Sequence, residues 1–422
     1  MPTPDKQQPE QDIDPDKVTI VVNGQSRSDW NRYCIESDFL IPADGWSVSL
    51  GIPDGIFPND IKKGMPVLVK VGDDVVLEGR IDRRQRSVAR KQVVLSLNGR
   101  DKAGILMDCT TPIFTAKQLS LEEIVANVVR PLGITKIRID ADSTIQTDKI
   151  TVEPGEKAWD TLEKAAAARG LWPWFEPDGT LVVGGVDYTQ PPVATLIMRF
   201  DGEENNLISL DETDSVLGCY SELTVLGQGH AQGKRGKKGD VAVIDASNSS
   251  TGRQARSLSS ASEPSEDEYD DIAYVSSSPE VGTHNLKVVV TDPDVPYYRP
   301  NIVVCGDIDN QEQLRYRARK IMSDAKLNSF DLVGEVHGHR TSDGILWQPG
   351  QRIHVICEPM DIDDVYFLIG RSFLGGRSGG TITQLRLKYD GVFIPDAYVE
   401  KKKKRKGKKK SDKVAIIDAS NK

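Results

Sequence analysis

Hydrophobic and polar residues alternate along much of the first hundred positions of the chain. In the segment 65–81 valines occupy every second position up to Gly72-Asp73-Asp74, and the alternation resumes after this turn. Period-two burial on both sides of a Gly/Asp turn predicts a β-hairpin. A further strand is expected at 93–97. Several short strands at this spacing predict a first small β-barrel over residues 18–101.

The pattern changes to a helical period after residue 102. Ser120 and Glu123 have the spacing of a capping box, and apolar residues then recur on one helical stripe. A second helix is expected at 157–169. Short strands are expected around the helices, at 136–140, 172–176 and 181–184. Together these elements predict an α+β module at residues 102–200.

The second half of the chain returns to β character. The region 201–227 is expected to supply strands that join the barrel region. The segment 228–271 is rich in Gly, Ser and charged residues and is predicted to be a flexible insertion. A helix that begins near Asn310 belongs to a second α+β module at 272–330. Strands between 331 and 389 predict a second β-barrel at 331–395, so the fold class is α+β and mainly β.

Charge is concentrated near one end of the chain. The 422 residues carry a net charge of -9, and the run Lys401 to Lys410 contributes nine basic residues, so the remainder has about -18 (-9 - 9). We expect a disordered acidic arm at 1–17 and a polybasic tail at 396–422. A nucleic-acid-binding domain usually lines a folded face with basic residues. The run leaves contact with nucleic acid, anionic lipid or an acidic partner open.

A short peptide occurs twice in the sequence. The stretch KKGDVAVIDASN at Lys237–Asn248 is repeated as KSDKVAIIDASN at Lys410–Asn421, and each copy follows a Gly/Lys-rich run. One interpretation is a pair of edge strands that add to a sheet of a neighbouring subunit or partner. The other is a local duplication without structural meaning. Both interpretations remain open from the sequence.

The sequence offers few candidates for chemistry. His337-Gly338-His339, with His354 nearby, is the one metal-like cluster, but no Cys, Asp or Glu stands beside it at ligand spacing. Solvent-facing strand histidines are therefore expected. The chain contains no GxSxG, HExxH or P-loop motif, and Gly375–Gly380 is predicted to be a hairpin loop. The five scattered cysteines predict reduced thiols, and no catalytic, cofactor or metal site is expected.

Several phrases, taken in their order, resemble the Mu-type baseplate hub family, which includes late-control D-like tail proteins. They are VTIVVNGQSRSDW, VVLEGRID, LSLNGRDKAGILMDCT, ITVEPGEKAWDTLEKAAAARGLWPWFEPDGTLVV and RARKIMSDAKLNSFDLVGEVHGHRTSDGILWQPGQRIHV. The resemblance covers most of 18–395 apart from the segment 228–271. The insertion, the polybasic tail and the repeated peptide depart from the family pattern.

The resemblance implies a structural role without catalysis. It implies a homotrimeric ring with two related barrels per subunit, which links a six-fold tail tube to a three-fold central spike. Partners would be tube, spike and other baseplate proteins, in a virion tail assembled in the cytoplasm of a bacterial host. The structural residues that carry it are Trp30, Gly99, Arg100, Asp101, Leu346, Trp347, Pro349 and Gly350.

Two other classes of function stay open at this point. One is a tail-associated cell-wall hydrolase, for which the sequence supplies only the weak pair His337 and His339. The other is a nucleic-acid or membrane-surface binding module that acts through Lys401 to Lys410. A trimer in solution would support the ring, whereas a monomer would move the weight to these two alternatives.

Overall fold

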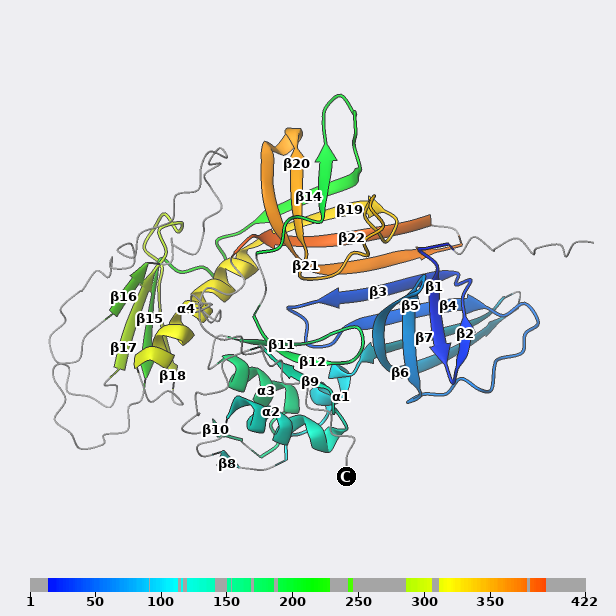
Figure 1. The fold of residues 1–422 in the computed structure, drawn as a ribbon, viewed down its shortest axis with the longest axis horizontal. Coiled ribbons are helices and arrows are strands. Elements are labelled where there is room, and N and C mark those ends of the chain that lie inside the picture. The colour runs from blue at the N-terminus through cyan, green and yellow to red at the C-terminus, as the bar shows by residue number, and fades with distance from the viewer. Residues whose placement is uncertain are drawn as a thin grey trace, which may run out of the picture.

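A computed structural model shows a large β-sheet with an α+β module and a smaller sheet attached (Figure 1). It describes residues 14–90, 92–112, 115–116, 120–140, 150–152, 154–167, 171–185, 189–227, 242–245, 286–305, 311–377 and 380–391. The expected arm before residue 14 and the polybasic tail lie outside these residues. Of the expected insertion 228–271, only 242–245 is described.

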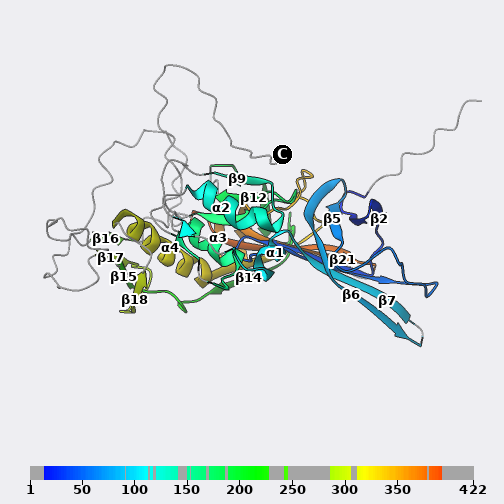
Figure 2. The same ribbon diagram turned by 90° about the horizontal axis from the view of Figure 1, so that it is seen from below.

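The first seven strands form the N-terminal lobe of the large sheet. They are β1 (Val18–Val22), β2 (Gln25–Arg27), β3 (Arg32–Asp38), β4 (Gly45–Gly51), β5 (Pro66–Val71), β6 (Asp74–Ala89) and β7 (Gln92–Asp101). The valines that alternate in the sequence are buried in β5, and β5 pairs with β6 as the expected antiparallel hairpin. In Figure 2 β6 and β7 extend away from the rest of the molecule.

The C-terminal lobe contains six more strands of the same sheet. They are β13 (Ala194–Met198), β14 (Leu207–Asp214), β19 (Phe330–His337), β20 (Arg352–Cys357), β21 (Ile362–Gly376) and β22 (Gly380–Tyr389). The expected hairpin loop at Gly375–Gly380 is confirmed, since β21 and β22 pair antiparallel up to Gly376 opposite Gly380.

The mainly β character is confirmed, but the strand pairings of the described residues close no barrel. They follow one open path, β14-β19-β22-β21-β3-β4-β7-β6-β5-β1-β2, with β20 and β13 added beside β21. The C-terminal lobe remains open between β13 and β14. There the side chain of Asn206 bridges the gap, because it accepts from the Ile197 amide at 2.7 Å and donates to the Thr195 carbonyl at 2.9 Å.

The predicted α+β module follows the N-terminal lobe. Its helices are α1 (Ala103–Asp108), α2 (Leu121–Val129) and α3 (Ala158–Ala167), and its small sheets are β11-β12-β9 and β10-β8. The strands are β8 (Thr115–Ala116), β9 (Ile137–Ile139), β10 (Ile150–Thr151), β11 (Trp172–Phe175) and β12 (Leu181–Gly184). The capping box is confirmed, with Ser120 and Glu123 bonded reciprocally at the start of α2. The module has its own hydrophobic core.

A four-stranded sheet and one long helix form the remaining unit. The sheet has the order β16-β17-β15-β18, and α4 (Gln311–Ser329) packs on it. The strands are β15 (Glu222–Gly227), β16 (Ala242–Asp245), β17 (Leu286–Thr291) and β18 (Pro300–Cys305). Strand β15 was expected to join the barrel region but pairs with β17 and β18 here. Its buried residues Leu223 and Val225 find their apolar partners on β17 and α4.

The two lobes of the large sheet share one hydrophobic core. This core includes Trp30 and Trp46 from the N-terminal lobe together with Leu346, Trp347 and Phe373 from the C-terminal lobe. Residues from opposite ends of the chain therefore exclude water together, which favours a fixed relative position of the lobes. Among the described helices, none has the length and apolar composition needed to cross a membrane.

Candidate assembly surfaces and the inter-lobe seam

The lobes meet where β3 pairs with β21, and we call this pairing, from Tyr33–Asp38 to Gly370–Gly375, the inter-lobe seam. Two glycines of β21 allow side chains of β3 to lie close against it. A Cβ added at Gly375 would be 2.4 Å from the Tyr33 hydroxyl oxygen, and one at Gly370 would be 2.6 Å from the Asp38 carboxylate. A larger side chain at either position would push the lobes apart.

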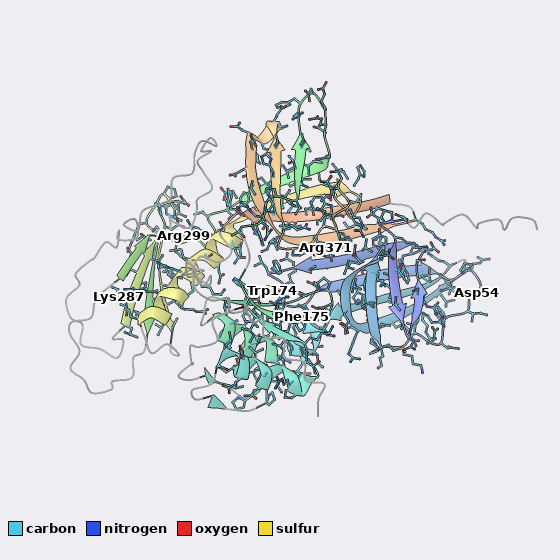
Figure 3. The ribbon with its side chains drawn as sticks, viewed as in Figure 1. Asp54, Trp174, Phe175, Lys287, Arg299 and Arg371 are labelled. Atoms are coloured by element: carbon cyan, nitrogen blue, oxygen red, sulfur yellow. The ribbon has the colours of Figure 1, made fainter. Side chains whose placement is uncertain are left out.

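Arg371 is a buried cation in the seam (Figure 3). Its guanidinium donates to the Ile35 carbonyl at 2.9 Å and lies 3.9 Å from the centroid of the Phe373 ring. Burial lowers the pKa of Arg371 to about 10, and attraction by the Asp44 carboxylate opposes this shift. The residue therefore remains charged at neutral pH, with the charge held against β3 of the other lobe.

The carboxylate of Asp44, which acts on this cation, lies close to a second carboxylate, that of Asp101. Burial raises the pKa of Asp44 to about 6, while a hydrogen bond with Ser37 and the charge of Arg371 lower it. The pKa of Asp101 is also raised, first by burial and then by repulsion from Asp44. Asp101 accepts from the Ala103 amide at 3.0 Å, and its own amide donates to the Asp44 carbonyl at 3.0 Å. This arrangement fixes the exit from β7 into α1.

His339 is fully buried, so the expectation of a solvent-facing strand histidine is wrong for this residue. Gly338 has φ +76°, so the chain turns there and His337 and His339 do not share one strand face. The ring of His339 bonds the Tyr33 hydroxyl and the Thr383 hydroxyl, both at 2.9 Å. Burial, together with the charge of Arg371, lowers its pKa to about 3. The imidazole is therefore neutral at neutral pH and serves as a hydrogen-bonding member of the seam.

No group of three or more His, Cys, Asp or Glu residues in the described part of the chain is arranged to hold a metal ion. His337 is exposed at the end of β19, and His354 on β20 instead pairs with Asp363, with the Nε2 atom 2.7 Å from the carboxylate. The three histidines of the metal-like cluster thus have three separate surroundings.

A second ionic cluster lies on the other side of the seam. Lys388 is 1% exposed and contacts the Asp331 carboxylate at 2.7 Å, and Arg386 bonds both Asp331 and Asp38. Burial alone would raise the pKa of Asp331, but the hydrogen bonds from Arg386 and Lys388 lower it. Because Asp38 belongs to β3 and the other residues to β19 and β22, this cluster also connects the lobes.

Arg340 ties the C-terminal lobe to the first residues of the N-terminal lobe. Its guanidinium donates to the Val71 carbonyl at 3.1 Å and to the Asp74 carboxylate at 2.8 Å. It also bonds the Pro15 carbonyl, and the carboxylate of Asp16 accepts from the His339 amide. Residues 15–16, which were expected to belong to a disordered arm, therefore have defined partners.

The four N-terminal candidate residues lie in two places. Trp30 is buried in the shared core and its indole donates to the Val18 carbonyl at 3.2 Å. Gly99 lies under Trp46, where an added Cβ would be 1.9 Å from the Arg80 carbonyl and 2.9 Å from the Trp46 ring. Arg100 bonds Asp82 of β6 and forms two bonds with Asp108 of α1. With Asp101, it joins the N-terminal lobe to the α+β module.

The four C-terminal candidates form a turn against the seam. Leu346 and Trp347 are buried in the shared core, and the Trp347 amide donates to the His339 carbonyl. Pro349 precedes Gly350, which has φ +97°, and a Cβ added at Gly350 would lie 3.6 Å from the Phe39 ring. Phe39 in turn has an edge contact with Trp174 of the α+β module. Trp30, Leu346 and Trp347 thus share one core, whereas Arg100 and Asp101 lie at the lobe exit.

Sequence reasoning missed an exposed basic hairpin. Strand β6 exposes Arg83 and Arg86, and the exposed Arg90 follows it at the outer end of the β6–β7 pair, which we call the arginine hairpin. Val88 at the same end is 73% exposed. A hollow on this sheet face is lined by Arg83, Arg100, Asp82, Glu36 and Trp46, among others. The signal was the density of arginines in GRIDRRQRSVAR, which is unusual for an acidic chain.

The opposite end of the large sheet is acidic. Strand β14 ends the strand path and exposes Asp211, Glu212 and Asp214, which we call the acidic edge. The loop that precedes it exposes Asp201, Glu203 and Glu204, and it also carries Phe200 at 80% exposure. One free sheet edge with negative charge and a projecting hairpin with positive charge are complementary surfaces on the same chain.

Four family models match consecutive parts of the chain. Residues 17–101 match the N-terminal domain of Mu phage baseplate assembly protein GpP-like proteins, and 103–185 match the second domain of baseplate hub protein gp44-like proteins. Residues 276–322 match the third domain of tail protein NMB1110-like proteins, and 324–392 match a tail protein C-terminal domain. The boundary between the first two matches coincides with the junction of the N-terminal lobe and the α+β module, and the third match includes β17, β18 and the first part of α4.

Whole-chain comparisons agree with these matches. The baseplate hub protein gp44 of Escherichia phage Mu is 24% identical over 410 residues, which cover 95% of this chain and 94% of the relative. The crystal structure of a tail protein from Neisseria meningitidis MC58 has a TM-score of 0.72 at 35% identity, covering 91% and 99% of the two chains. A 43 kDa tail protein of prophage MuSo2 from Shewanella oneidensis has a TM-score of 0.69 at 20% identity, covering 89% and 99%.

Proposed function

The chain belongs to the Mu-type family of baseplate hub and tail proteins, and on this premise we propose that it forms a homotrimeric hub that links the tail tube to the central spike. Its role in the baseplate is structural, as in its relatives. We place it in the virion tail, after assembly in the cytoplasm of a bacterial host. The number of copies and the contacts between them are inferred from its surfaces.

The observation that carries the proposal is the pair of β lobes in one sheet. Each chain supplies an N-terminal and a C-terminal lobe, which the inter-lobe seam holds side by side. Three chains would supply six lobes, which would suit a six-fold tube on one side and a three-fold spike on the other. Because the lobes differ in sequence and strand number, the six-fold symmetry of such a ring is approximate.

The contact between neighbouring subunits is assigned to the arginine hairpin and the acidic edge. The hairpin lies in the N-terminal lobe and the acidic edge in the C-terminal lobe, so one subunit would use its hairpin and the next its edge. Such a head-to-tail contact generates a closed ring when the rotation closes. It would also cover the outer side of β14, which pairs with no other strand among the described residues and is open to unwanted pairing.

The mass of the full chain in solution, measured by light scattering behind a sizing column, tests the proposal. We expect a trimer for the unchanged protein and a monomer for the double variant Arg83→Glu/Arg86→Glu, because like charges then face each other. The variant Asp211→Arg/Asp214→Arg should also be a monomer. When both sets of changes are combined in one chain, the complementary charges are restored and the trimer should return.

The choice of residues and a test of folding make the measurement specific. Arg80 and Arg84 bond the Gly64 and Ile61 carbonyls within the lobe, so they are not substituted. Circular dichroism of each variant checks that the sheet is intact. A monomer of the unchanged protein at high concentration contradicts the ring. A trimer that survives both charge reversals contradicts the assigned contact and leaves the trimer in place.

A further inference from the structure

The first copy of the repeated peptide contains an edge strand. Residues Ala242–Asp245 form β16 and pair in parallel with β17, from Ala242 opposite Val288 to Asp245 opposite Thr291. Strand β16 ends the four-stranded sheet, so one side of it faces no other strand of that sheet. The peptide was open to two interpretations from sequence, and this copy acts as a strand.

The second copy has the same strand-forming residues. Val414–Asn421 matches Val241–Asn248 at seven of eight positions, and the single difference places Ile416 where the first copy has Val243. Both residues are β-branched and favour strands equally well. Main-chain bonds supply most of the affinity of an added strand, and the side chains set its register. A peptide that fits the β17 edge is therefore present twice in one chain.

We propose that the outer edge of β17 is a strand-exchange site, at which Ala415–Asp418 of the same chain replaces β16. In the shared register Ala415 would lie opposite Val288 and Asp418 opposite Thr291. There are two peptides and one edge, so the two copies exclude each other. The occupant determines which part of the chain is anchored at the small sheet.

The last strand of the large sheet, β22, ends close enough to β17 for the second copy to reach it. The Tyr389 ring, in the last strand of the large sheet, stacks on Phe330 with 3.8 Å between centroids. Phe330 directly follows α4, whose residues Leu314, Ala318 and Met322 pack on Val288 and Val290 of β17. A helix of 19 residues is about 28 Å long. The 26 residue steps from Tyr389 to Ala415 span up to about 90 Å when extended, so they reach β17 of the same chain.

The exchange has a consequence for charge. The run Lys401 to Lys410, with nine basic residues, directly precedes the second copy. When the second copy occupies the β17 edge, this run is held beside the small sheet. When the first copy occupies the edge, this pairing does not hold the run there. The site would thus control where the basic run can meet a negatively charged surface.

Hydrogen exchange of the full-length protein tests the redundancy of the two copies. Proline has no amide hydrogen to donate to a strand ladder, so Val243→Pro removes the first copy and Ile416→Pro the second. We expect the β17 amides that face the edge to stay protected in each single variant. In the double variant they should exchange at least about tenfold faster. Loss of protection in Val243→Pro alone, or retained protection in the double variant, overturns the proposal.

Cross-linking identifies the chain that supplies the second copy. In the Val243→Pro background, Val289→Cys and Ile416→Cys would be neighbours and should form a disulfide under mild oxidation. Val289→Cys with Lys406→Cys is the matched control, because position 406 lies in the same tail outside the copy. In a mixture of isotope-labelled and unlabelled protein, cross-linked peptides should carry one label only. Mixed labels, or equal yields in the control, overturn the same-chain arrangement, and neither result depends on the trimer.

Discussion

The large sheet and the small sheet differ in how firmly their strands are held. At the inter-lobe seam, β3 and β21 bring together residues from distant parts of the chain, and buried groups such as Arg371 and His339 find partners there. The small sheet is held by one helix and by a core of few residues, and its edge strand β16 contains four residues. Both sheets are built of similar β-branched strands. They differ in how many stabilising contacts would be lost if one strand left the sheet.

The β3–β21 pairing is a fixed junction, whereas the β16–β17 pairing is the one that we propose to be exchangeable. Removal of β21 from β3 would leave the buried charge of Arg371 without its partner on β3 and would expose the shared core to water. The free-energy cost would be far larger than the stabilisation that a surface contact provides. Removal of β16 would leave this edge of β17 without its strand partner. A hub must keep its lobes in place while parts of it adapt to partners, and the strand exchange proposed for the small sheet would allow such adaptation.

Substitution of Gly99 by valine should have the largest effect on the fixed part. The new side chain would collide with the Arg80 carbonyl and the Trp46 ring, and neither can move without disturbing the core. We expect the free energy of unfolding to fall by more than about 3 kcal/mol, measured by urea denaturation. The matched control is Asn98→Ala on the exposed face of the same strand. A stable Gly99→Val protein would show that Trp46 has room to shift.

Substitution of Asp331 by asparagine should have the next largest effect. It leaves the buried Lys388 without its anionic partner. It also removes one of the two carboxylate charges that Arg386 contacts, so that Arg386 keeps only Asp38. We expect a loss of about 3 kcal/mol in urea denaturation, because an unpaired buried charge is costly. Asp363→Asn, which affects the solvent-exposed pair with His354, should change stability little. Equal effects of both changes would contradict a special role of the seam.

The pH dependence of stability tests His339. Its pKa is about 3 in the folded protein, below the ordinary value of 6.5, so between these values the unfolded chain binds a proton that the folded chain does not. The free energy of unfolding therefore falls as pH falls through this window, by about 2–3 kcal/mol at pH 4.5. His339→Asn should lack this part of the slope. Parallel curves for the two proteins from pH 7 to 4.5 would contradict a buried neutral imidazole.

Substitution of Asp292 by asparagine should have the smallest effect, confined to the small sheet. The carboxylate is 2% exposed and lies 3.0 Å from the Lys326 ammonium of α4. Removal of its charge should weaken the contact of α4 with β17 by about 1–2 kcal/mol. Hydrogen exchange should speed up in β15 and β17 and stay unchanged in β21. Faster exchange in β21 would show that the two sheets unfold together and would contradict their independent stability.

Local signals in the sequence located most elements correctly. The alternation in 65–81 gave the β5–β6 hairpin, and Ser120 with Glu123 marked the start of α2. The joining of the lobes had no local signal, because Ile35 and Arg371 are 336 positions apart and their pairing depends on the whole fold. The two predicted barrels therefore became one open sheet.

The candidate residues were predicted unevenly for the same reason. Large apolar residues such as Trp30 and Trp347 were predictable, since they bury wherever a core forms. His339 was misplaced because a strand pattern was assumed through Gly338, where the backbone turns. Arg371 gave a weak signal, as a single charge in the apolar run of β21, and Asp44 gave none. Burial of charged residues depends on partners that lie far away in sequence.

The pairing of β3 with β21 also affects how the protein is made. The partner of Ile35 follows 336 residues later, and at typical translation rates this separation takes about 20–70 s. During that time β3 has an unpaired edge and the N-terminal half of the core lacks its other half. High contact order slows folding for the same reason. We therefore expect nascent chains to need protection by chaperones until the ribosome has released β21.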